Sequence, residues 1–76
     1  MDKETLKKAK ALEYQIGRNE EAIEHLKNIR IYDDGIISIH KEQILVSKGE
    51  AEQVVEFLLD LKKKNLEVLK KEMEAL

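Results

Sequence analysis

The sequence has no cysteine among its 76 residues, and only two histidines and three glycines. Without cysteine, neither a disulfide framework nor a thiolate metal site can stabilise the chain. His25 and His40 do not stand in a spacing typical of metal ligands, such as HExxH, so we expect no metal and no cofactor. Three glycines form no glycine-rich phosphate-binding loop. These absences favour a protein that is not an enzyme.

Long apolar segments are also missing. No run approaches the roughly 20 residues that a membrane-spanning helix needs. The first ten residues, MDKETLKKAK, have no apolar segment behind their charges, so we expect no secretory signal and a cytoplasmic protein. With no such run, we expect no membrane as a partner. The net charge is -2 and gives no general attraction to phosphate backbones, so we expect no duplex nucleic acid as a partner.

The chain is short enough that its stability is in question. A single domain over residues 1–76 buries little surface, and disulfides are not available to compensate. Association is the remaining way to gain stability. We therefore expect a homo-oligomer.

Residues 2–28 are predicted to form a helix. Asp2 can accept hydrogen bonds from the free N–H groups of the first turn, and Asn28 can end the helix in the left-handed conformation. Asn19 interrupts an apolar series at alternating spacings of three and four, which is typical of a coiled-coil seam. The candidate oligomer seam residues in this helix are Leu12, Ile16, Ile23 and Leu26.

Residues 48–76 are predicted to form the second helix. Ser47 stands three residues before Glu50, the spacing of a capping box, so the helix should begin at Lys48. Its front half is apolar on several sides, and we expect Phe57, Leu58 and Leu61 to meet a sheet or a second chain. The candidate seam residues in this helix are Val55, Leu59, Leu66, Leu69 and Met73.

The β-branched residues gather between the helices, in residues 29–47. In one interpretation, Asp33, Asp34 and Gly35 form a turn, with positive φ at Gly35, between strands 29–32 and 36–40, and a third strand covers 44–47. In the other, the first helix runs to about Ile31 and one hairpin pairs 36–40 with 43–47. Ile37 and Ile39 share one strand face in both, and Ile36 shares the other with His40.

The charges suggest how the parts associate. The first helix is basic early and acidic late, and the second is acidic early and basic at 62–64. A simple helical hairpin would bring the two acidic stretches together, where like charges repel. A splayed pair or an exchange between chains would relieve this. The predicted fold class is α+β, mostly α: helix, short β-hairpin of two or three strands, helix, with coiled-coil-like pairing in an oligomer.

This order of elements resembles the prefoldin subunit. Residues 44–76, ILVSKGEAEQVVEFLLDLKKKNLEVLKKEMEAL, look like the strand, charged turn and C-terminal coiled-coil helix of its alpha-type subunits. The resemblance implies hairpins that build a barrel-like platform and helices that project as client-gripping arms. It thus implies a chaperone-like activity.

Three functional hypotheses follow. The first is a non-enzymatic protein that binds and blocks or sequesters a partner protein, as a phage-type inhibitor or adaptor would. The second is a sponge for a small anionic, nucleotide-like ligand held between subunits by ion pairing and stacking, with Arg30 and Tyr32 on one strand face. The third is the prefoldin-like chaperone. The candidate ligand- or partner-binding residues are Arg30, Tyr32, Ile36, Ile37, Ile39, His40, Lys41 and Leu58.

The seam can be tested by placing a charge in it. We expect Ile16→Asp to dissociate the oligomer and largely unfold the chain, because the carboxylate would be buried without a partner. Circular dichroism and native mass spectrometry measure the two effects. An unchanged oligomer mass would contradict the proposed seam.

Overall fold

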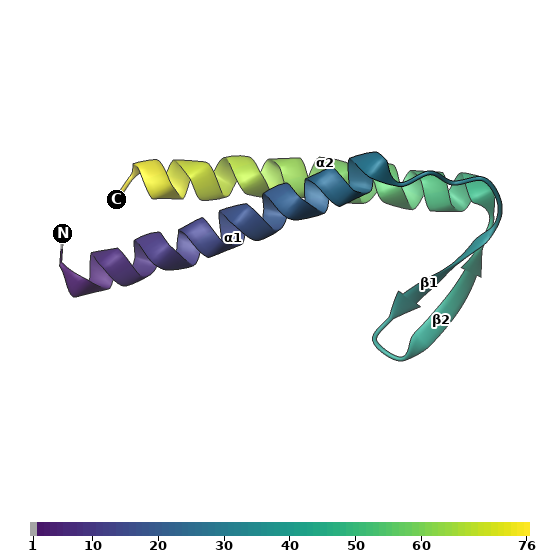
Figure 1. Ribbon diagram of the computed structural model, residues 1–76, viewed down its shortest axis with the longest axis horizontal. Helices are drawn as coiled ribbons and strands as arrows, with labels where there is room; N and C mark the ends of the chain where they lie inside the picture. The colour runs from purple at the N-terminus through teal and green to yellow at the C-terminus, as the bar shows by residue number, and fades with distance from the viewer. Residues whose placement is uncertain (1) are drawn as a thin grey trace.

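The protein consists of two long helices joined through a β-hairpin. The computed structural model describes residues 2–76. Helix α1 spans Lys3–Asn28, strand β1 Gly35–Ile39, strand β2 Glu42–Val46 and helix α2 Lys48–Glu74 (Figure 1). The predicted fold class is therefore confirmed as α+β, mostly α, with a hairpin of two strands.

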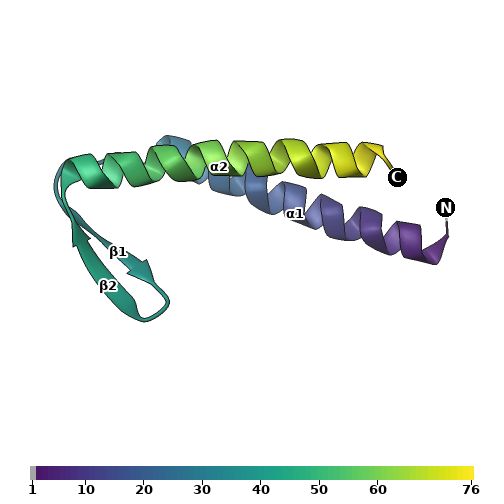
Figure 2. The same ribbon diagram turned by 180° about the vertical axis from the view of Figure 1, so that it is seen from behind.

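The helices lie side by side and antiparallel, and they diverge toward the two chain ends (Figures 1 and 2). The hairpin projects from the opposite end of the pair, where α2 begins, and bends back beneath the helices. The principal-axis extents of the Cα trace are 51 × 24 × 15 Å. Within residues 2–76 the helix pair is thus a single layer, with no second layer over its broad faces.

A heptad-spaced seam joins α1 to α2. All nine predicted seam residues are half-buried or buried, but only Ile23 and Val46 fall below a tenth exposed among the described residues. Asn19 and Lys62 occupy half-buried positions in the same series. Asn19 Nδ2 donates to the Gln15 carbonyl oxygen at 2.9 Å, while its Oδ1 is buried without a partner. The seam pairs helices of one chain, and its role between chains stays a prediction.

Both predicted helix starts are confirmed. Asp2 Oδ1 accepts from the Thr5 N–H at 2.7 Å, which lowers the pKa of Asp2. At α2 the Ser47 Oγ accepts from the Glu50 N–H, and a Glu50 carboxylate oxygen accepts from the Ser47 N–H at 2.9 Å. The hydrogen bond from the Ser47 N–H lowers the pKa of the Glu50 carboxyl. This capping box fixes where the hairpin ends and α2 begins.

The predicted end of α1 at residue 28 is confirmed, but the predicted cap is wrong. Asn28 does not adopt the left-handed conformation, because among the described residues only His40 has a positive φ outside glycine, and the C-cap is Ile29 in an extended conformation. The alternative in which the helix continues to Ile31 is wrong too. Gly17 lies in α1 with open space where a Cβ atom would stand, so no close contact with another element requires glycine at this position.

Residues 29–34 form no strand, so the predicted three-stranded version is wrong. Gly35 is the first residue of β1 and does not have positive φ. Ile29 and Ile31 instead line a hollow with Val55 near the start of α2. Asp34 Oδ1 accepts from the Lys48 N–H at 3.1 Å, which fastens this loop to the first turn of α2.

The single hairpin has a tight turn at His40 and Lys41. Its register pairs Gly35 with Val46 and Ile37 with Ile44 in antiparallel order. His40 adopts φ 56°, in the left-handed region that reverses the chain direction here. The second interpretation, a single hairpin pairing 36–40 with 43–47, therefore predicted the correct topology. Each strand begins and ends one residue earlier than predicted.

The capping box makes a pH-dependent contribution to stability. Glu50 has a lowered pKa in the folded state, so its contribution is present above the ordinary carboxyl value of 4.5 and is lost as the pH falls through the folded value. We expect Ser47→Ala to cost about 1 kcal/mol at pH 7 and to lose less further stability on acidification than the original chain. Urea unfolding at pH 7 and pH 3 measures both.

The matched control is Glu67→Gln, at an exposed α2 position outside the capping box. It should change the unfolding free energy little at pH 7. Equal acid sensitivity of the Ser47→Ala variant and the original chain would show that the cap does not carry this pH dependence.

Candidate partner-binding surface

The two faces of the β-hairpin differ in what they contact. Alternation along the strands places one set of side chains toward α2 and the other away from it. We call the set toward α2 the inner face, which consists of the apolar residues Ile37, Ile39, Ile44 and Val46 together with Gly35 and Glu42. The outer face consists of Ile36, Ser38, Gln43 and Leu45.

The outer face presents an apolar pair to solvent. Ile36 and Leu45 stand directly opposite each other in the register, with 63% and 76% of their surfaces exposed. The adjoining pair is Ser38 with Gln43, which is polar and exposed. The described residues pair β1 and β2 only with each other, so each strand has a free edge of N–H and C=O groups.

The inner face borders a groove against α2. Val46 is 8% exposed at the base of the hairpin, Ile37 is half-buried, and Ile39 and Ile44 are exposed nearer the turn. The groove has a volume of about 380 Å³. The residues that line it are Val46, Glu50, Gln53, Val54, Phe57 and Leu58. Val46 of the hairpin lines this groove together with Phe57 and Leu58, but Phe57, Leu58 and Leu61 remain exposed, so the sheet does not bury them as predicted.

The remaining predicted site residues lie at two ends of the hairpin. Arg30 and Tyr32 are in the loop before β1, whereas His40 and Lys41 form the turn, and a five-residue strand of roughly 17 Å separates the two places. Arg30 Nη1 donates to the Lys27 and Ile29 carbonyl oxygens at 3.1 and 3.2 Å. The idea that Arg30 and Tyr32 alternate on a strand face is wrong, and one chain does not gather the four side chains.

Sequence reasoning missed Ile44 and Leu45 as candidate surface residues. The signal was present, since the segments GIISI and EQILV have apolar residues on both strand faces. An isolated hairpin can bury only one of these faces against its own helix. Apolar residues on both faces therefore indicate that at least one face remains open.

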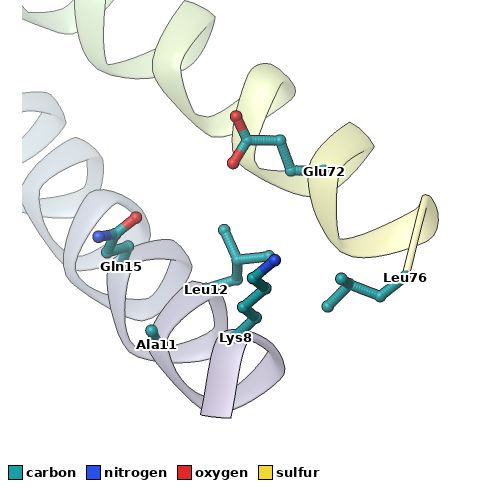
Figure 3. Close-up of a pocket in the computed structure, with 6 residues that line it drawn as sticks. All are labelled: Lys8, Ala11, Leu12, Gln15, Glu72 and Leu76. Atoms are coloured by element: carbon teal, nitrogen blue, oxygen red, sulfur yellow. The ribbon is translucent and has the colours of Figure 1, made fainter. Parts of the chain in front are cut away.

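A second hollow lies at the diverging end of the helix pair (Figure 3). Leu12 of α1 and Leu76 after α2 point into the gap between the helices, and Lys8 and Glu72 flank it. Its volume is about 390 Å³, and Ala11 and Gln15 complete the lining. The lining has a lysine and a carboxylate but no nucleophile with an adjacent base, so it does not resemble a catalytic centre.

Three findings concern the class of protein. Within residues 2–76, no group of three His, Asp or Glu side chains could hold a metal ion. No helix in that range combines the length and apolar character needed to cross a membrane. Comparison of the chain with protein families, curated proteins and solved structures gave no match.

The exposed and buried residues of β2 should respond differently to substitution. We expect Leu45→Ser to change the unfolding free energy by less than about 0.5 kcal/mol, because its side chain contacts little. The neighbouring Val46→Ser should cost about 2 kcal/mol, because a buried apolar side chain is lost. Chemical denaturation of the two variants measures this difference. Equal losses would show that the outer face supports the fold and is not a free surface.

Proposed function

We propose that the protein is a small, non-enzymatic homo-oligomer that binds another protein through the outer face of its hairpin and thereby blocks or sequesters it. A phage-type inhibitor or adaptor acts in this way. The observation that supports the proposal is the solvent-exposed Ile36–Leu45 pair on a strand ladder with free edges.

The shape of this surface favours a protein partner. Small-molecule sites are concave and enclose most of the ligand. The outer face of the hairpin is an open, two-stranded surface. A partner strand could pair with a free edge through its main chain while Ile36 and Leu45 enter apolar pockets on the partner. Tyr32, which is 83% exposed in the preceding loop, offers a third anchor of the kind enriched in protein interfaces.

The two alternative hypotheses have less support. A sponge for an anionic ligand would need Arg30, Tyr32, His40 and Lys41 to come together from different chains, since one chain holds them apart. A prefoldin-like chaperone would need long projecting arms. Here α1 has 26 residues and is about 39 Å long, and it is paired with α2 along the molecule.

The test is native mass spectrometry of the tagged protein recovered from its own host. We expect one host protein bound in a defined ratio. The variant Leu45→Glu should reduce that complex at least tenfold, because a carboxylate would enter an apolar pocket without a partner. The matched control is Tyr14→Glu, which changes an exposed aromatic residue on α1, away from the hairpin.

Other outcomes would contradict the proposal in distinct ways. A small bound mass with no host protein would point to the ligand sponge. A mixture of unfolded host proteins would point to the chaperone. Loss of the complex in the Tyr14→Glu variant alone would place the binding surface on α1.

A further inference from the structure

The folded chain exposes more surface than a compact protein of its mass. The accessible surface is 6501 Å² for 8.9 kDa. A compact monomer of that mass exposes roughly 4,800 Å², which leaves an excess of about 1,700 Å² per chain. A standard interface covers about 800 Å² on each partner. The excess is therefore large enough for a substantial interface with another chain.

One side of α2 carries the apolar residues that such an interface needs. Beside the seam runs a second stripe, defined by Val54, Leu58, Leu61 and Val68. These positions are spaced four, three and seven apart, so they fall on one side of the helix. The other side of the seam is charged. It carries Glu56, Asp60, Lys63, Glu67, Lys70 and Glu74.

The groove under the hairpin and the hollow at the diverging end both open along the face that contains this second stripe. Val54 and Leu58 line the groove under the hairpin, and Glu72, which continues the stripe by one turn, lines the hollow at the diverging end. Figure 3 shows Leu12 and Leu76 facing this latter hollow. A single uncovered face thus runs from the inner face of the hairpin to the chain ends.

Charge is distributed unevenly between the two halves of the molecule. Residues 15–61, the half of the molecule nearer the hairpin, carry ten acidic and five basic side chains. Residues 2–14 and 62–76, the half nearer the chain ends, carry six acidic and nine basic side chains. Two copies in parallel would bring the acidic halves together. Two antiparallel copies would set each acidic half beside a basic half.

We infer that this face binds a second copy of the chain in antiparallel orientation, with the second stripes of the two copies packed together in a four-helix layer. The inference rests on the homo-oligomeric part of the proposed function and adds the face and the orientation. The hairpin groove of each copy then lies toward the diverging helix ends of the other. The outer face of each hairpin stays free.

A twofold axis across the middle of the helices produces this arrangement and makes the interface the same on both chains. Leu61 lies near the middle of α2, so Leu61 of each copy falls close to that axis. Leu58 and Val68 flank it on either side. The apolar centre and charged surroundings match the usual anatomy of a protein interface.

The first test separates the face from the rest of the surface. We expect Leu61→Glu to raise the dimer dissociation constant at least 100-fold in analytical ultracentrifugation. The helical circular dichroism of this variant, measured at the same subunit concentration as the original chain, shows whether it still folds. Leu45→Glu and Tyr14→Glu should change the constant less than threefold. Because Leu45 lies on the outer face, loss of the host protein and loss of the dimer are separate results.

The second test determines orientation and uses the absence of cysteine. Spin labels attached through Lys3→Cys should lie about 40 Å apart in the antiparallel dimer, because the helix rise carries the two labels away from the axis in opposite directions. In a parallel dimer they should lie about 20 Å apart. Labels at Gln15→Cys, near the middle of α1 and so near the axis, should lie about 20 Å apart in both. Raising the salt from 0.05 to 0.5 M should weaken the antiparallel dimer several-fold, because it screens the opposite charges.

Each contrary result overturns the inference. A monomer at 100 µM, a short distance between the Lys3→Cys labels, or a dimer that tightens with salt would do so. A folded Leu61→Glu variant that keeps its dimer would place the interface elsewhere. If Leu61→Glu removes a bound host protein from a chain that is monomeric, the face belongs to another protein.

Discussion

The packing of α1 against α2 is the contact on which the rest of the structure depends. It is a narrow contact, because each helix offers one heptad-spaced stripe and the pair forms a single layer. The buried residues Ile23 and Val46 lie in the part of the molecule nearer the hairpin, and the helices diverge toward the chain ends. The seam therefore holds the molecule together most firmly beside the hairpin.

Polar residues within the seam limit its strength and add specificity. Asn19 satisfies one of its polar atoms within its own helix and leaves Oδ1 buried without a partner. A buried acceptor without a donor costs about 1–3 kcal/mol. Lys62 keeps a charge at another seam position, where its methylene groups can pack while the ammonium reaches water. Such residues weaken a coiled-coil contact but disfavour alternative registers.

The sequence predicts the parts of this structure that depend on local chemistry. Asp2, Ser47 and Glu50 act through neighbours three residues away, so their spacing alone reveals both helix starts. Residues 29–34 were harder, because β-branched residues suit a strand and a helix contact equally well. Ile29 and Ile31 line a hollow together with Val55, and the Asp34 carboxylate accepts from the Lys48 N–H, 14 residues along the chain. Neither contact leaves a short-range pattern. The candidate surface was predicted only in part. Ile36 was predicted, but the position of Leu45 opposite it follows from the strand register, which the sequence pattern did not fix.

The hairpin also changes how easily the two helices find each other during folding. The connection between Asn28 and Lys48 has 19 residues, and the entropy lost on closing a loop grows with its length. Pairing of β1 with β2 brings Gly35 beside Val46 by contacts that are local in sequence. A hairpin forms within about 1–10 µs, on the fast side of folding events. Once the hairpin has formed, the effective loop between the two helices contains only residues 29–34 and Ser47 as unpaired residues. The same segment that offers an open surface in the folded protein thus shortens the search that brings α1 and α2 together.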